Sequence, residues 1–231
     1  MEGLCRDLER FMEPDAIRSF IGRLSLQKGR LATEKINLIR TSVRMEINMY
    51  YKMKVAGVER DLPLCPINEE LYIGAFILFG DVELTEKCAE ELYKRAPEHD
   101  VMITAESKGI PLIHAMCRIS GKNRYALARK SVKLYMRDVI ACETKSITTG
   151  NAQTLYIDGF DAEYMRGKRV LIVDDVISTG GSLLSLENLV KKAGGEVVGK
   201  MAILAEGDAT ERDDIIYLEK LPLFNKEGNP I

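Results

Sequence analysis

The chain has 231 residues, of which 46% are apolar, 29% charged and 6% aromatic, and its formal net charge is −2. This apolar content excludes a disordered chain, and the near-neutral charge argues against binding polyanions over the whole surface, although not against a local basic patch. No apolar run approaches the ~20 residues that span a bilayer, and the charged first fifteen residues lack the apolar core of a secretory signal. We therefore expect a soluble, cytoplasmic protein with no membrane segment.

The cysteines and histidines are few and scattered. The cysteines are odd in number, widely spaced and without a C-x-x-C pair: Cys5, Cys65, Cys88, Cys117 and Cys142. This spacing argues against a disulfide framework or a zinc site and favours buried thiols in a reducing compartment. Two histidines leave little material for a histidine-based metal site.

Residues 1–64 are predicted to form a helical N-terminal extension. Over residues 33–53, apolar side chains recur at steps of three and four, which predicts one stripe on a helix: Ile36, Ile39, Val43, Ile47 and Tyr50. Prolines then punctuate the chain at Pro63 and Pro66. We therefore expect a second, larger domain over residues 65–231.

Strands and helices alternate in this second domain. We predict helices over residues 85–95, 111–121 and 182–192, and strands over 100–105, 125–128, 170–173 and 196–205. The polar residues 129–154 lack a core pattern, and we expect a flexible lid loop there. A strand, a helix and a strand at this spacing form a right-handed parallel crossover, so the predicted fold is α/β, with a mostly parallel sheet flanked by helices.

The strongest chemical signal follows the apolar run 170–173. Asp174 and Asp175 end a strand of the kind that is buried in a parallel sheet, at the edge where open α/β sheets bind ligands. A turn of hydroxyl and glycine residues then opens a helix: Ser178, Thr179, Gly180, Gly181 and Ser182. Backbone N–H groups, hydroxyls and the positive helix end can together bind a phosphate, which glycine lets the backbone approach closely. The turn matches neither a Walker loop nor a dinucleotide fingerprint.

The two carboxylates indicate which phosphate compound fits this turn. They would repel phosphate alone, but they can accept hydrogen bonds from the vicinal hydroxyls of a phosphorylated sugar and can hold a hydrated Mg²⁺. The stretch resembles the phosphoribosyl-pyrophosphate signature of type I phosphoribosyltransferases, and the similarity covers about residues 67–205.

This resemblance implies the type I phosphoribosyltransferase fold and the transfer of 5-phosphoribose from its diphosphate to a nitrogenous base, with Mg²⁺ as cofactor. It assigns the ribose 2- and 3-hydroxyls, and indirectly the Mg²⁺, to Asp174 and Asp175. It assigns the 5-phosphate to residues 178–182, and it implies a homodimer.

A second strand-to-helix turn stands about 70 residues earlier, at Glu106, Ser107, Lys108 and Gly109. In the family that the chain resembles, the turn after the first strand binds the leaving pyrophosphate, often through a strained peptide bond whose counterpart here is Ser107–Lys108. Lys108 would add positive charge. Taken alone, the same residues also fit an ordinary turn.

Cations follow the strand predicted over residues 125–128, at Arg129, Lys130 and Lys133. They could neutralise a diphosphate, and they resemble the Arg-Lys pair of purine-specific members, although a solvated basic loop is the alternative. Glu143 is the nearest counterpart of the lid glutamate that approaches the base in adenine-type relatives. A solvated glutamate is the other interpretation.

The base is indicated by what the chain lacks. Family members with 6-oxopurine substrates typically carry a third Asp where this chain has Ser178, and orotate enzymes typically carry a Lys and a His-Gly in the lid. The adenine and xanthine branch is therefore closest, with adenine preferred and an orotate-type enzyme as one alternative.

The other alternative is a purine-linked regulator that senses phosphoribosyl pyrophosphate and binds nucleic acid. Residues 23–54 carry eight Lys or Arg against two Glu, but a charged outer helix face explains them as well and is favoured.

Overall fold

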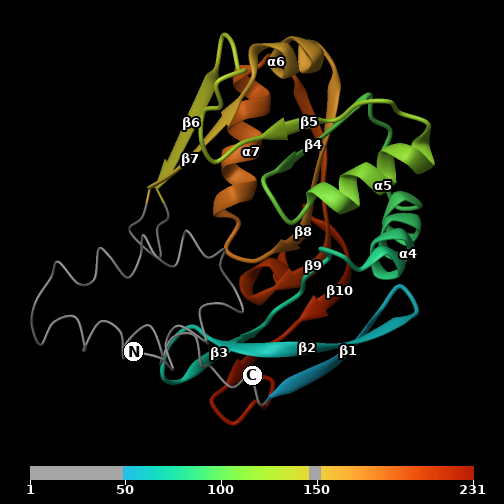
Figure 1. The fold of residues 1–231 in the computed structure, drawn as a ribbon, viewed down its shortest axis with the longest axis vertical. Coiled ribbons are helices and arrows are strands. Elements are labelled where there is room, and N and C mark those ends of the chain that lie inside the picture. The colour runs from blue at the N-terminus through green and yellow to red at the C-terminus, as the bar shows by residue number, and fades with distance from the viewer. Residues whose placement is uncertain (1–48, 146–151) are drawn as a thin grey trace, which may run out of the picture. The chain divides into compact units, whose positions relative to one another are not determined.

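A computed structural model describes residues 49–145 and 152–231 (Figure 1). Of the two compact units into which the chain divides, these residues belong to the second, residues 47–231. Its elements are β1 (Tyr50–Val55), β2 (Val58–Pro66), β3 (Leu71–Gly74), α4 (Val82–Tyr93), β4 (Val101–Ala105), α5 (Ile110–Ser120), β5 (Ala126–Ala128), β6 (Ile140–Lys145), β7 (Ala152–Ile157), α6 (Gly159–Met165), β8 (Arg169–Ile177), α7 (Gly181–Lys192), β9 (Glu196–Glu206), the 3-10 helix η1 (Gly207–Glu211), β10 (Ile216–Leu221) and β11 (Leu223–Asn225).

A five-stranded sheet with the order β10-β9-β8-β4-β5 forms the centre, and every neighbouring pair in it is parallel. The predicted α/β fold is confirmed. All five residues of β4 are buried, as expected of a strand covered on both faces of a parallel sheet. The predicted helices and strands over residues 85–128 and 170–205 are present, with boundaries shifted by a few residues.

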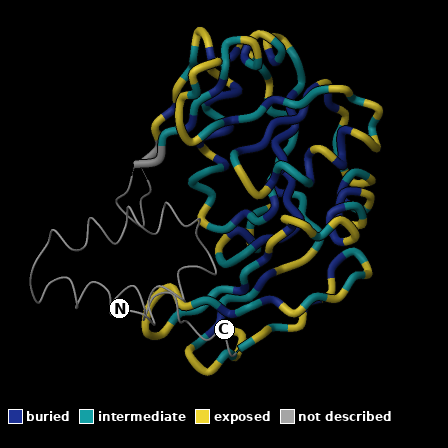
Figure 2. The backbone as a smooth tube through the Cα atoms, in the orientation of Figure 1, coloured by how far each residue is buried: buried dark blue, intermediate teal, exposed yellow. Residues whose placement is uncertain are grey.

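Two apolar cores lie on the two sides of this sheet. The buried residues run through its central strands (Figure 2). Residues of α6, α7 and the strands β6 and β7 pack into one of them, and residues of α4 and α5 pack into the other. The side chains of β8 alternate between the cores, with Val170 and Ile172 in the first and Leu171 and Val173 in the second. This alternation is the two-residue period of a strand, and it fixes both helix layers on the sheet.

A separate, four-stranded antiparallel sheet has the order β1-β2-β3-β11. The predicted helix over residues 33–53 is wrong at Tyr50–Met53, which lie in β1, while residues 33–48 lie outside the described part of the chain. Met53 and Val55 are buried at alternate positions against the second core, so burial and pairing with β2 override the helical spacing. The expected domain boundary after Leu64 falls inside β2.

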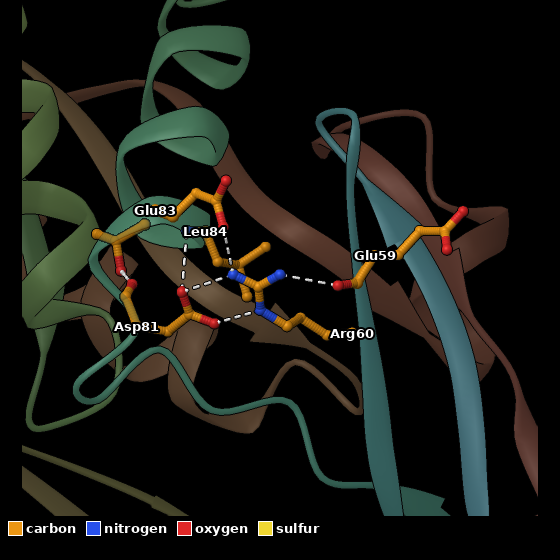
Figure 3. Close-up of polar contacts among 6 residues, drawn as sticks. Glu59, Arg60, Asp81, Glu83 and Leu84 are labelled. Atoms are coloured by element: carbon orange, nitrogen blue, oxygen red, sulfur yellow. Dashed lines mark hydrogen bonds and ion pairs between the residues drawn. The ribbon is translucent and has the colours of Figure 1, made fainter.

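Arg60 ties this small sheet to the first turn of α4 (Figure 3). Its Nε donates to Asp81 at 2.7 Å, and its Nη2 donates to Glu83 at 2.8 Å and to Asp81 at 3.1 Å. Asp81 is also the N-cap of α4 and accepts a hydrogen bond from the backbone N–H of Leu84 at 3.1 Å. The hydrogen bond from Arg60 lowers the pKa of Asp81, so the cap stays ionised.

The lid segment contains regular structure, contrary to the sequence prediction. β6 and β7 pair as an antiparallel hairpin, with Cys142 opposite Leu155. Cys142, Leu155 and Ile157 are buried in the core that α7 shares. The alternating apolar positions were hidden in the sequence among Ser, Thr and charged residues, and only the packing against α7 selects a hairpin. Residues 146–151, between the two strands, lie outside the described residues.

Two expectations from composition can be compared with the structure. Within residues 49–145 and 152–231, no helix is long and apolar enough to span a membrane. Four cysteines are free thiols, and three of them, Cys88, Cys117 and Cys142, are buried. The prediction of unpaired thiols is confirmed for these positions, whereas Cys5 is not among the described residues.

Candidate functional site

The two predicted turns meet at the point where the order of the central sheet reverses. β4 and β8 are neighbours, and the chain continues from β4 to β5 on one side of the sheet and from β8 to β9 on the other. Ligands of open α/β sheets bind outside the carboxyl ends of the strands at such a switch point. The register pairs Ile103 with Ile172, so the turn after β4 and the acids of β8 lie at the same edge.

Gly109 brings the β4–α5 turn against β8. It is buried, it is the N-cap of α5, and a Cβ built on it would clash with the Thr104 hydroxyl and lie 3.0 Å from Oδ1 of Asp174. Any side chain here would push the β4–α5 turn away from β8, so the close approach requires glycine. The structure therefore brings together the predicted pyrophosphate turn and the predicted sugar-binding acids.

The unusual peptide bond of this turn is not the one predicted. The cis bond joins Glu106 to Ser107, not Ser107 to Lys108. β4 ends at Ala105 and the turn begins at Glu106, as the sequence predicted, so the difference concerns the peptide bond and not the position of the turn. Ser107 and Lys108 are exposed, and Glu106 is partly buried.

Asp174 and Asp175 are neighbouring acids at the carboxyl end of β8, Asp174 partly buried and Asp175 buried. Asp175 is 5% exposed, and its Oδ2 has no hydrogen-bond partner among the described residues. Oδ1 of Asp174 accepts a hydrogen bond from the backbone N–H of Asp175 at 2.9 Å. Burial, and then the neighbouring Asp175, raise the pKa of Asp174 well above its ordinary value, and burial raises that of Asp175. A hydroxyl or cation that pairs with these oxygens would relieve both costs.

Lys108 and Glu206 are two further charged residues at this edge of the sheet. The positive charge of Lys108 opposes the pKa increases of Asp174, Asp175 and Glu206, so it lies close enough to act on all three carboxyls. Glu206 is half-buried at the end of β9, and burial raises its pKa. No phosphate-binding motif marks Glu206 in the sequence, although it is the last residue of β9, the strand next to β8.

The β8–α7 turn has the expected form of an anion site. Residues 178–182 and Asp174 are among those that line a small cavity of about 70 Å³. Gly180 is the N-cap of α7 with φ of 77°, a left-handed conformation that favours glycine, and no side chain caps the helix. The N-terminus of α7 lines this cavity, and the positive end of the helix favours an anion there. This cavity is far below the ~300 Å³ of ordinary small-molecule pockets, and it suits a phosphate group rather than a base.

The predicted cations gather around Glu106. Arg129 Nη1 donates to Oε1 of Glu106 at 3.2 Å, and the backbone N–H of Lys130 donates to Oε2 at 3.1 Å. The hydrogen bond from Lys130 lowers the pKa of Glu106, and the charge of Lys133 acts in the same direction. The predicted residues Glu106, Arg129, Lys130 and Lys133 thus form one cluster at the pyrophosphate turn.

Glu143 is not drawn into this cluster. It lies exposed on β6, next to the buried Cys142, so strand alternation directs it away from the packed face of the hairpin. Its expected approach to a base would need the hairpin to move relative to the sheet.

The carboxylates of the site suit Mg²⁺ that is held partly by other ligands. Mg²⁺ prefers oxygen ligands and keeps several waters, with one or two carboxylates and substrate phosphates. Asp174 and the unpartnered Oδ2 of Asp175 offer such oxygens. In the described part of the chain, no group of three or more His, Cys, Asp or Glu side chains could hold a metal. The residues therefore fit a shared Mg²⁺, not one bound by protein alone.

Fold and site together define an α/β domain with two turns that suit anions and a carboxylate pair at the same edge of the sheet. The family model "Phosphoribosyl transferase domain" matches residues 82–226, more than half of the chain. The chain belongs to this phosphoribosyltransferase family, as its motifs predicted.

The curated relatives are named for purines. The chain is 34% identical over 109 residues to a hypoxanthine/guanine phosphoribosyltransferase of Methanotorris igneus, covering 47% of this chain and 55% of the relative. It is 29% identical over 160 residues to the protein of that name from a Methanocaldococcus species, covering 65% and 78%. The chain spans about half the length of the first of these relatives.

Solved structures show the same fold. The adenine phosphoribosyltransferase of Thermoanaerobacter pseudethanolicus superposes with a TM-score of 0.55 at 22% identity, over 74% of this chain and 95% of that one. The adenine phosphoribosyltransferase of Leishmania tarentolae gives 0.55 at 21% identity, over 75% and 84%. The expected type I phosphoribosyltransferase fold is confirmed, and the lid hairpin and the β1 strand are the two corrections to it.

Proposed function

We propose that this chain transfers the 5-phosphoribosyl group from phosphoribosyl pyrophosphate to a purine base and releases pyrophosphate. The observation that carries the proposal is the buried pair Asp174 and Asp175, with an unpartnered oxygen, between two turns that suit anions. Vicinal hydroxyls of a ribose between two phosphate groups would supply what these carboxylates lack.

The reaction needs charge stabilisation and alignment more than acid–base chemistry. The bond between C1 of the sugar and the pyrophosphate oxygen breaks, with its electron pair leaving on oxygen, while a purine nitrogen bonds to C1. The proton of that nitrogen passes to water. Residues 178–182 would hold the 5-phosphate and Asp174 and Asp175 the ribose hydroxyls, so the sugar is fixed at both ends. Lys108, Arg129, Lys130 and Lys133 would stabilise the charge that develops on pyrophosphate. Mg²⁺, when bound, would supply further charge neutralisation at the diphosphate.

The identity of the base is the finer part of this proposal. We prefer adenine, since Ser178 replaces the third Asp that 6-oxopurine members typically carry. The curated relatives named for hypoxanthine and guanine weigh against that preference, so both kinds of purine belong in the test. Glu143 is proposed to approach the base once the hairpin closes over the substrate.

The test is incubation of the full chain with phosphoribosyl pyrophosphate, Mg²⁺ and each of adenine, xanthine, hypoxanthine, guanine and orotate. Pyrophosphate release that depends on a purine supports the enzyme, and release with orotate alone contradicts the purine assignment. Sugar-diphosphate binding without turnover on any base would favour the regulator. A gel shift whose affinity falls steeply with salt would then support nucleic-acid binding. We also propose a cytoplasmic homodimer, which sedimentation of the purified protein tests for its assembly.

A further inference from the structure

Arg212, which follows η1, lies against the β8–α7 turn. Its guanidinium nitrogen Nη1 is 2.9 Å from the position that a Cβ on Gly180 would occupy. A residue with a side chain at this point of the turn would displace the guanidinium. Gly180, which gives the turn its left-handed conformation, therefore also leaves room for the guanidinium of Arg212.

The guanidinium is held in one orientation by ion pairs. Its Nε and Nη2 donate to the two carboxylate oxygens of Asp214, each at 2.8 Å, which is the bidentate geometry that suits Arg and carboxylate. Lys200 donates to Asp214 and, at 3.0 Å, to Glu187. Glu187 belongs to α7, so the network connects the arginine to the helix that the turn begins.

The remaining arm of the guanidinium is left to face the turn. Nη1 of Arg212 has no hydrogen-bond partner among residues 49–145 and 152–231, and the side chain is 35% exposed. The hydrogen bond from Arg212 holds the pKa of Asp214 well below its ordinary value, so the carboxylate that orients the arginine stays ionised.

The charges of the site explain what this arm can do. Asp174 lines the same cavity, and Glu206 follows Ala205, which pairs with Ile177 just before the turn. Each of these carboxyls repels an anion when it is ionised. The helix N-terminus alone contributes only about half an elementary charge. A second source of positive charge is therefore needed where the anion sits, and a fixed guanidinium arm supplies it with a directed donor.

We propose that Arg212 is a ligand of the 5-phosphate of the bound sugar, donating through Nη1, and that Asp214 is the positioning residue that orients it. This inference rests on the proposed function, since it assigns a further residue to the same sugar site. It also makes the site selective for phosphorylated sugars, because removal of the phosphate leaves the arginine without an acceptor.

The experiment measures binding of ribose 5-phosphate, ribose and pyrophosphate to the full chain by titration calorimetry. For Arg212→Gln we expect affinity for ribose 5-phosphate to fall by about 10- to 100-fold, the usual size of a hydrogen bond between charged groups. Pyrophosphate affinity stays unchanged, and Arg212→Lys gives an intermediate loss. The matched control is Arg166→Gln, which breaks an Arg–Glu pair at the end of α6 and should change neither affinity.

Each outcome decides a separate point. A wild-type chain that binds no ribose 5-phosphate contradicts the sugar site itself, whereas Arg212→Gln with wild-type binding contradicts only the role of Arg212. Equal losses for ribose 5-phosphate and pyrophosphate would show that Arg212 merely supports the fold. If Arg212→Gln does not fold, Asp214→Asn keeps the arginine and should still lower the preference for ribose 5-phosphate over ribose.

Discussion

The acids at the two ends of β4 and β8 differ in their hydrogen-bond partners and in the direction of their pKa shifts. At the amino ends, Asp100 accepts hydrogen bonds from Arg169 through the backbone N–H at 2.9 Å, Nε at 3.1 Å and Nη2 at 2.9 Å. These bonds hold the pKa of Asp100 well below its usual range. At the carboxyl ends, Asp174 and Asp175 have raised pKa values and an unpartnered oxygen.

This difference separates the part of the sheet that supports the fold from the part that is prepared for a ligand. Asp100 has its charge balanced inside the protein, so ligand binding there has nothing to add. The carboxyl-end acids are costly to bury as they stand, and a bound sugar or cation would recover that cost. Substitutions at the two ends should therefore have opposite effects on stability and on binding.

The largest expected effect is on ligand binding at the carboxyl end. Asp175→Asn keeps the shape of the side chain but removes the charge that accepts ribose hydroxyls. We expect affinity for phosphoribosyl pyrophosphate with Mg²⁺ to fall by about 10- to 100-fold, as for loss of a charged hydrogen bond. Calorimetric titration measures it, with Asp100→Asn as the control at the other end. Equal losses in both variants would contradict the division of roles.

The next effect concerns the contact between the β4–α5 turn and β8. Gly109→Ala places a methyl group against Thr104 and Asp174, so it should cost about 1–3 kcal/mol of unfolding free energy as an overpacked site does. Gly181→Ala is the matched control for stability, because a Cβ there has no heavy atom within 4 Å. Urea unfolding of both variants compares them. If Gly109→Ala matches the wild type in stability, the β4–α5 turn is not in tight contact with β8.

The carboxyl-end acids should also make the ligand-free protein less stable as pH rises. Their raised pKa values mean that the folded state holds protons that the unfolded state has already lost. This stabilisation is fully present below the unfolded pKa, near 3.8, and is lost as pH rises through the higher folded pKa. Asp174→Asn should remove much of that slope and stabilise the ligand-free chain at neutral pH by about 1 kcal/mol. Thermal melts at several pH values measure it, and an unchanged slope would mean that neither acid is ionised at a cost.

The smallest effect is expected at the amino end. Asp100→Asn should lower stability slightly at neutral pH, because the pairing with Arg169 is largely exposed and screened by solvent. The lowered pKa gives this contribution the opposite sign: it is present above the unfolded pKa and disappears as pH falls through the folded one. Turnover measured well below the melting temperature should equal that of the wild type. A loss of turnover would place Asp100 in the functional part of the sheet.

The regions that the sequence predicted well are those in which one segment carries its own signal. Apolar periodicity, with glycine or proline near the ends of the elements, marks β4, α5, β8, α7 and β9. The positions of the β4–α5 and β8–α7 turns follow from the ends of these elements. The regions predicted poorly depend on distant partners. β3 pairs with β11, about 150 residues later in the chain, and the β6–β7 hairpin is selected by its packing on α7.

Site residues divide in the same way. Asp174, Asp175 and residues 178–182 stand together in one motif, so the sequence alone identifies them. Glu206 is the last residue of β9, and Arg212 follows η1. Neither belongs to a phosphate-binding motif. Their nearness to the sugar site is visible only once β9 lies beside β8.

The local order of residues determined the parallel α/β core, both strand-to-helix turns and the acids before the second turn, because each arises within a single strand–turn–helix segment. Tertiary structure decided which acids are balanced and which are left unpartnered, since that depends on Arg169 at one end of the strands and on the absence of a comparable contact to Asp175, within the described residues, at the other. It also decided where Arg212 lies. Two charges from remote segments pair only where the fold brings them close, and the order of residues does not give that distance.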